Sequence, residues 1–171
     1  VTRIKPNQYA GQQMQSFTIP DGIEEIGEAA FYNCADLTKV NIPNSVKTIK
    51  YSAFYQCIKL KDINLPRSIQ TIENAVFADC ESLEKIVIPN GITLIDDYLF
   101  NNCRNLKEVT LPNTIKTIGE SAFANCTALE SIIIPEGVTA IDDIAFEDCK
   151  NLKKLVLPST LESIGYRAFG G

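Results

Sequence analysis

The 171-residue sequence contains no histidine and no tryptophan, and its net charge is −5. Without histidine, the most usual general base of enzyme sites is missing. An acidic balance argues against nucleic acid and an anionic membrane surface as partners, because both are bound through basic stripes. The apolar runs are only a few residues long, so we expect no direct membrane insertion, and no basic-then-apolar secretion signal opens the chain.

A unit of 23 residues recurs in register along the chain, and one clear copy runs from Ala122 to Ile141. The unit reads A-F-x-x-C-x-x-L-x-x-[VI]-x-[IL]-P-x-[GST]-[VIL]-x-x-I. Every cysteine of the sequence lies in this register, at Cys34, Cys57, Cys80, Cys103, Cys126 and Cys149. The same period places phenylalanine at Phe31, Phe54, Phe77, Phe100, Phe123, Phe146 and Phe169. A fixed period of this length predicts a solenoid, in which each repeat packs on its neighbours.

The strand of each repeat is clearest around Ile133. Ile132 and Ile134 occupy inward-facing positions, and the residue directly before each of them occupies an outward-facing position. Alternation of this kind with β-branched residues is typical of a half-buried strand, in which Ser131 and Ile133 point outwards. Pro135 follows directly and has no N–H, so it ends the strand.

Two further sides complete the predicted coil. Residues 19–22 fit a type I turn, with proline second and glycine fourth. Residues 138–141 then predict a second short extended segment. Residues 143–149 are too few for a helix of normal length, and we expect a turn or one helical turn there, with Phe146 and Cys149 facing inwards.

The predicted fold is an α/β-type solenoid that is mostly β. We expect a right-handed superhelix of 23-residue coils, with a parallel β-sheet on the strand side and turns or short helical turns opposite. Residues 1–171 are expected to form one solenoid domain. Because one coil buries too little apolar surface to offset its backbone entropy, stability should grow with the number of coils.

The two ends differ from the regular repeats. The first repeat, residues 1–20, is irregular and one residue shorter, but its apolar rows are occupied by Val1, Ile4, Tyr9, Met14 and Phe17. At the other end, the chain stops at Gly171, one residue before the next cysteine is due. Both ends fall inside a repeat, so we expect the chain to be a fragment of a longer protein.

The unit resembles the leucine-rich repeats, because Leu37-x-x-Val40-x-Ile42 matches the first half of their common pattern. Ser45 stands where those repeats place asparagine. The proline after the strand and the A-F-x-x-C segment resemble the BspA-like subfamily, also called the Treponema pallidum type. This resemblance implies a secreted or cell-surface protein that binds host matrix proteins or other cells. The family shares no ligand residues, so none are carried over.

The six cysteines have a structural interpretation. Zinc sites need paired ligands such as C-x-x-C, whereas here each coil supplies one cysteine, three residues after a phenylalanine. We expect all six thiols to be buried and reduced, with each acting as a small apolar residue. Stacked side chains point the same way, so disulfides between neighbouring coils are not expected.

Acidic residues gather on one predicted edge, at Asp96, Asp97, Glu120, Asp142 and Asp143. Calcium takes several carboxylates, but no D-x-D-x-[DN]-G loop is present. A solvated acidic edge is the simpler interpretation. We expect no metal and no cofactor, and no enzyme activity, because a solenoid offers a surface rather than a cleft for paired carboxylates.

Two surfaces are candidates for binding. The outward strand positions become apolar towards the C-terminal half, which fits either a contact surface or plain β-propensity. The candidate residues there are Lys85, Val87, Glu108, Thr110, Ser131, Ile133, Lys154 and Val156. The second candidate surface is Tyr32, Tyr51 and Tyr55, which either bind a partner or merely cover the turn side.

The sequence therefore predicts a non-catalytic protein-binding module. We expect a host extracellular-matrix protein, a surface protein or a second copy of this chain as the partner. The expected location is the cell surface or the extracellular space. The alternative is an intracellular scaffold for protein–protein interactions, because buried thiols survive in either compartment.

Overall fold

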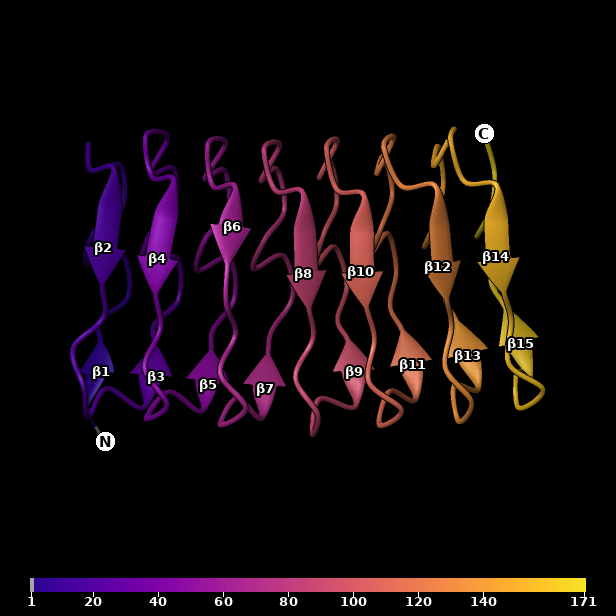
Figure 1. Ribbon diagram of the computed structural model, residues 1–171, viewed down its shortest axis with the longest axis horizontal. Coiled ribbons are helices and arrows are strands. Elements are labelled where there is room, and N and C mark those ends of the chain that lie inside the picture. Colours follow the sequence, from indigo (N-terminus) through magenta and orange to yellow (C-terminus); the bar gives the residue numbers. More distant parts are fainter. Residues whose placement is uncertain (1) are drawn as a thin grey trace.

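The computed structural model describes residues 2–171 as a row of stacked coils whose long axis runs across Figure 1. Val1, which the sequence pattern places on an apolar row, lies outside the described residues. The strand side holds β2 (Ser16–Thr18), β4 (Lys39–Asn41), β6 (Asp62–Ile63), β8 (Lys85–Val87), β10 (Glu108–Thr110), β12 (Ser131–Ile133) and β14 (Lys154–Val156). The second side holds β1 (Arg3–Ile4), β3 (Glu25–Ile26), β5 (Thr48–Ile49), β7 (Thr71–Ile72), β9 (Leu94–Ile95), β11 (Thr117–Ile118), β13 (Ala140–Ile141) and β15 (Ser163–Ile164).

All strand pairs are parallel, and each joins a coil to the next. On the strand side, pairing gives β2-β4-β6, β8-β10 and β12-β14. On the second side, it gives β1-β3-β5-β7 and β9-β11-β13-β15. Each coil thus has the predicted strand side and second extended side, and the parallel solenoid is confirmed.

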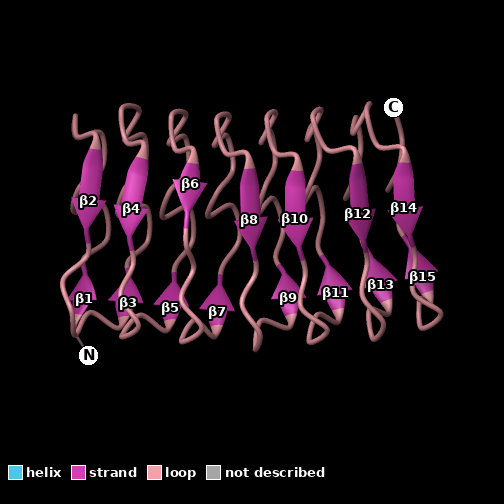
Figure 2. Ribbon diagram, viewed as in Figure 1, coloured by secondary structure: helices cyan, strands magenta, loops and turns pink. Residues whose placement is uncertain are grey.

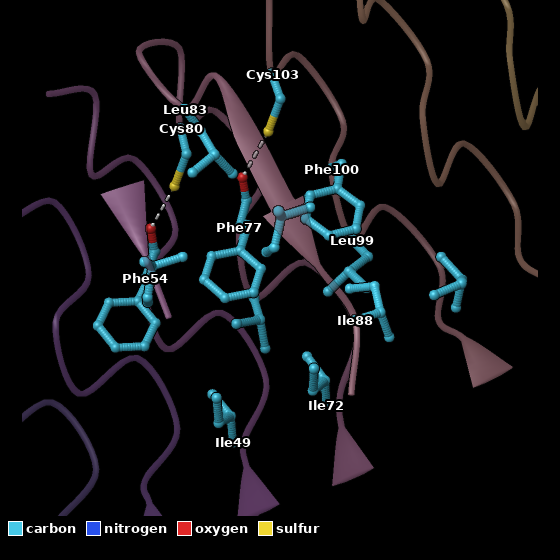
Figure 3. Packing of buried hydrophobic residues seen from close by; sticks show 14 of the residues in the cluster. Ile49, Phe54, Ile72, Phe77, Cys80, Leu83, Ile88, Leu99, Phe100 and Cys103 are labelled. Atoms are coloured by element: carbon cyan, nitrogen blue, oxygen red, sulfur yellow. Dashed lines mark hydrogen bonds between the residues drawn. The ribbon is translucent and has the colours of Figure 1, made fainter. Parts of the chain in front are cut away.

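The core is a set of ladders of identical residues. Phenylalanine rings from Phe31 to Phe169 stack in one column, with centroids of neighbours 5.0–5.8 Å apart and interplanar angles of 5–20°. Figure 3 shows part of this column at Phe54, Phe77 and Phe100, beside the isoleucines of the second side. Offset stacking adds to the hydrophobic gain, so each ring ties a coil to both neighbours.

The turn side corrects one part of the prediction, because residues 2–171 contain no helical turn there. Figure 2 shows only strands and loops. Three overlapping turns replace the helix, closed by the N–H groups of Ala30, Tyr32 and Cys34 onto the carbonyls three residues earlier. Ala29 and Asn33 have φ values of 50° and 54°, which no α-helix contains.

The reason for these turns is the bonding between coils. The N–H of Phe31 donates to the carbonyl of Ala53 at 2.8 Å, and those of Ala29 and Asn33 donate to the next coil in the same way. In a helix these N–H groups would bond within their own coil. Two left-handed residues, four positions apart, turn them along the solenoid axis, so the turn side is also joined from coil to coil.

The first repeat follows the predicted rows. Phe17 pairs with Val40, and Ile4 pairs with Ile26. The ring of Tyr9 stacks on Phe31 with centroids 5.3 Å apart, which confirms its place on the phenylalanine row. Within residues 2–171, no helix has the length and apolar character that crossing a membrane requires.

Candidate binding face

The strand side presents two outward residues per coil. Val87, Ile133 and Val156 are 63%, 68% and 54% exposed. Ile132, which has the opposite parity, is buried. The predicted polar members of this face are all exposed, namely Lys85, Glu108, Thr110, Ser131 and Lys154. The inner and outer parities of β12 are therefore as predicted, and the whole set lies on one side of the molecule.

The strand ladder is interrupted where β10 meets β12. No strand pairing joins these two elements among residues 2–171, although both pair with their other neighbour. A groove of about 730 Å³ opens at this break. The candidate residues that line it are Glu108, Thr110, Ser131, Ile133 and Val156. The structure thus brings five of the eight predicted residues together around one depression.

The remaining candidates lie beside this groove. Lys85 and Val87 line a smaller groove of about 350 Å³ at the second ladder break, between β6 and β8. Glu108 lines both grooves and so connects them. Lys154 lines neither but is registered with Ser131 on the neighbouring strand.

Sequence reasoning missed two features of the larger groove. Leu157 has the inward parity but is 41% exposed and lines the groove with Pro135. Glu136 follows the proline and supplies a carboxylate at the same end. The charge of Glu136 is readable in the sequence, whereas Leu157 is exposed because it follows β14, the last strand of the strand side, which no further coil of residues 2–171 covers.

The tyrosine surface is also assembled as predicted. The rings of Tyr32 and Tyr55 lie with centroids 5.5 Å apart. Partial burial raises the pKa of Tyr55, and the nearby charge of Asp79 raises it further. Tyr51 is exposed and its N–H donates to the Glu73 carboxylate at 2.9 Å. These contacts lie within the turn side, so the surface has a covering role even without a partner.

The cysteines form a ladder of thiol hydrogen bonds. Each S–H donates to a carbonyl of the preceding coil, as from Cys80 to Phe54 at 3.2 Å and from Cys103 to Phe77 at 3.1 Å (Figure 3). Burial raises the pKa of these thiols well above its ordinary value. The cysteine row therefore both fills the core and bonds the backbone.

One prediction about the thiols was wrong. Five of them are buried, but Cys149 is only half-buried, because it lies near the C-terminal end face, where no full coil packs over it. Burial still raises its pKa to about 12. All six are free thiols, as predicted.

The acidic edge has a backbone role. The carboxylate of Asp97 accepts the N–H of Glu120 at 2.8 Å, and that of Asp143 accepts the N–H of Tyr166 at 2.6 Å. Partial burial raises the pKa of Asp96. Within residues 2–171, no cluster of three or more histidine, cysteine or acidic side chains could hold a metal ion. The edge acts as a set of caps between coils.

Parallel strands, a phenylalanine column and a proline after each strand of the strand side define a leucine-rich repeat solenoid. The family model for the BspA-type leucine-rich repeat region matches residues 2–128 and 70–171, with 6 copies. The chain therefore belongs to the BspA-type leucine-rich repeat family.

Solved bacterial structures agree with this assignment. A leucine-rich repeat protein of Bacteroides ovatus is 35% identical with a TM-score of 0.90, over 96% of this chain and 43% of that one. A leucine-rich cell-surface protein of Faecalibacterium prausnitzii is 38% identical with a TM-score of 0.87, over 95% of this chain and 44% of that one. The leucine-rich repeat protein of Treponema pallidum is 36% identical with a TM-score of 0.87, over 95% and 77%.

The chain thus spans less than half the length of the first two of these relatives. Among curated proteins, none matches it significantly. The solenoid class is generally a non-catalytic fold that binds other proteins over an extended surface.

Proposed function

We propose that this chain is the non-catalytic protein-binding module of a cell-surface or secreted protein, and that it adheres to matrix proteins or to other cells. The strand face makes the contact. The description of the Faecalibacterium prausnitzii relative as a cell-surface protein supports this location for the present chain. The absence of histidine from the sequence supports a role in binding rather than in catalysis.

The observation that carries the proposal is the apolar row on the strand face. Val87, Ile133 and Val156 are more than half exposed, so none of them contributes to the core. Further towards the N-terminus the same row is polar, and Asn41 donates to Thr18 at 3.1 Å. Folding requires only β-compatible residues at these positions. An apolar strip confined to one half of the face is therefore better explained by contact with a partner.

The surroundings of this strip fit a protein partner. The groove between β10 and β12 offers a depression for an apolar side chain, with Leu157 and Pro135 in its wall. Glu108, Glu136 and Lys154 place charges of both signs around it. An apolar centre with a polar rim is the usual anatomy of protein interfaces, in which a few buried anchors carry most of the affinity.

The test is a pair of double variants with the same added charge. Ile133→Lys with Val156→Lys places two lysines in the apolar strip, and Thr18→Lys with Asn41→Lys places two on the polar half of the same row. All four positions are exposed, so both variants should keep the wild-type circular dichroism spectrum and urea midpoint. Binding is measured on a surface coated with reconstituted extracellular matrix.

Wild-type protein should bind this surface saturably, and the first variant should lose at least tenfold in affinity while the second stays within about twofold, since each 1.4 kcal/mol is tenfold. Equal binding by the two variants would show that the binding site is not on the strand face. The exposed Tyr51 would then be tested next, by Tyr51→Lys. No saturable binding of the wild-type protein would contradict adhesion to matrix.

A further inference from the structure

The sequence contains one asparagine–glycine pair, Asn90-Gly91, and the fold places it in the turn between β8 and β9. Both residues are exposed. The turn is closed by the N–H of Ile92, which donates to the carbonyl of Pro89 at 3.4 Å. Gly91 has a φ of 103°, a conformation that glycine adopts without strain. In such a pair, the backbone nitrogen of the glycine is linked closely enough to reach the side-chain carbonyl carbon of the asparagine and close a succinimide ring.

The nitrogen of Gly91 has room for this approach. A Cβ atom at Gly91 would meet nothing beyond its chain neighbours within 4 Å, so the space beside the backbone is open. The N–H of Gly91 donates to the hydroxyl of Thr114 in the next coil at 3.4 Å, which is longer than the usual range of about 2.7–3.2 Å. At the same turn position, Gly137 donates to Thr160 at 2.9 Å. The two hydrogen bonds that this turn must open, to Pro89 and to Thr114, are therefore long and weak.

Two other asparagines occupy the same turn position but lack the glycine. Asn44 is followed by Ser45 and Asn113 by Thr114, and both asparagines are exposed. In these pairs the side chain of the second residue crowds its own backbone nitrogen and narrows the range of φ, so the close approach is hindered. Asp21 precedes a glycine, but a carboxylate is a poor target for a nucleophile and has no ammonia to lose. An exposed turn, a side-chain amide and a following glycine therefore coincide in one coil.

We propose that Asn90 is a site of spontaneous deamidation, which converts this thermolabile residue over time into a mixture of aspartate and isoaspartate. The nitrogen of Gly91 gives up its proton to solvent base and bonds to the side-chain carbonyl carbon of Asn90, and the side-chain nitrogen takes up a proton and leaves as ammonia. Water then opens the succinimide ring. Opening at the side-chain carbonyl gives aspartate, whereas opening at the main-chain carbonyl gives isoaspartate. Water is the one co-reactant, and one ammonia is released for each chain.

Both products place a carboxylate on the row of turns that follows the strand face. The same turn position holds Arg67 in the preceding coil, and its side chain is exposed, so the new carboxylate lies about 4.8 Å, one coil, from a position with a guanidinium. Isoaspartate also adds one main-chain atom between β8 and β9, which pair in register with β10 and β11. Ageing therefore changes both the charge of this surface and the length of one coil. This modification is independent of the proposed binding function.

The test is incubation of the native protein for several weeks at pH 6 and at pH 8, followed by tryptic digestion and mass spectrometry. The peptide of residues 86–104 carries the site, and its aspartate and isoaspartate forms have the same mass but separate by chromatography. Two variants exchange the residue after the asparagine. Gly91→Thr copies the pair that the next coil holds at Asn113, and Ser45→Gly gives Asn44 a following glycine. Because each variant copies a pair that another coil already has, both should keep the wild-type circular dichroism spectrum.

Asn90 should convert at least about tenfold faster than Asn44 and Asn113, because glycine leaves the attacking nitrogen uncrowded. Its conversion should be faster at pH 8 than at pH 6 and should yield isoaspartate as well as aspartate. Gly91→Thr should slow it to the rate of Asn113, and Ser45→Gly should raise Asn44 towards the rate of Asn90. Equal rates at the three asparagines of the wild-type protein overturn the proposal. Aspartate as the sole product, or an unchanged rate in Gly91→Thr, overturns it as well, since either result means direct hydrolysis of the side chain.

Discussion

Removing one ring from the middle of the phenylalanine column should cost far more than removing the ring at its end. Phe100 is fully buried, and its ring lies 5.7 Å from that of Phe77 and 5.3 Å from that of Phe123. Phe169 is half-buried and stacks only on Phe146, at 5.2 Å. Because each coil packs on its neighbours, Phe100→Ala weakens two contacts between coils and Phe169→Ala one.

The magnitude for Phe100 follows from burial and stacking. A buried phenylalanine hides about 150 Å². At about 25 cal/mol per Å², that burial is worth roughly 4 kcal/mol. Two ring pairs add about 0.5–1.5 kcal/mol each. Alanine keeps part of the buried area and the site partly collapses, so about 4–5 kcal/mol is expected, at the upper end of such substitutions.

For Phe169, half the area and one ring pair give about 2.5–3.5 kcal/mol, and about 2 kcal/mol is expected after the same allowance for the area that alanine keeps. The assay is urea unfolding followed by far-ultraviolet circular dichroism, with the free energy of unfolding taken from midpoint and slope. If Phe100→Ala costs no more than Phe169→Ala, the column does not couple the coils, and the stacking argument is wrong.

Two further outcomes follow from the turn side and the thiols. In the native protein at pH 8, a thiol reagent should modify Cys149 first, because the others are buried. Even this reaction should be slow, because burial raises the pKa of Cys149 to about 12. All six thiols should react in urea, and fast reaction of several in the native state would contradict the burial. Asn125 has a φ of 62°, so Asn125→Val should cost about 1–2 kcal/mol. Asn125→Gly should stay within about 0.5 kcal/mol, and equal costs for the two changes in urea unfolding would exclude backbone strain as the cause.

The predictable part of this fold is what repeats. The inward and outward positions that Ile132 and Ile133 occupy recur in every copy of the unit. The parity, the strand position and the core rows were therefore readable from one coil. The phenylalanine column follows from stacking identical positions. Tyr9 was placed on that column, although it is a different residue, because its spacing from Ile4 is kept.

The turn side was less predictable, because its hydrogen bonds depend on the neighbouring coil. Residues 143–149 contain alanine and phenylalanine, which a helix accepts, and the left-handed residue Ile144, with φ 62°, is β-branched and gives no local signal. Local preference is overridden there by bonds such as that from the N–H of Phe146 to Ala168. For the binding face, the exposure of Ile133 was readable, but the groove beside it was not, since the break between β10 and β12 has no mark in the sequence.

The direction of the hydrogen bonds between coils has a mechanical consequence. On all three sides these bonds run along the length of the solenoid, whose long axis lies across Figure 1, although strand pairing is interrupted between β6 and β8, between β7 and β9 and between β10 and β12. A pull on the two ends of the chain therefore loads the outermost coil alone, as in a zipper, instead of shearing all coils at once. Coils should peel away singly, and each releases 23 residues, or about 75–80 Å of extended chain. A surface protein built this way would lengthen in steps under flow and limit the force on whatever it holds.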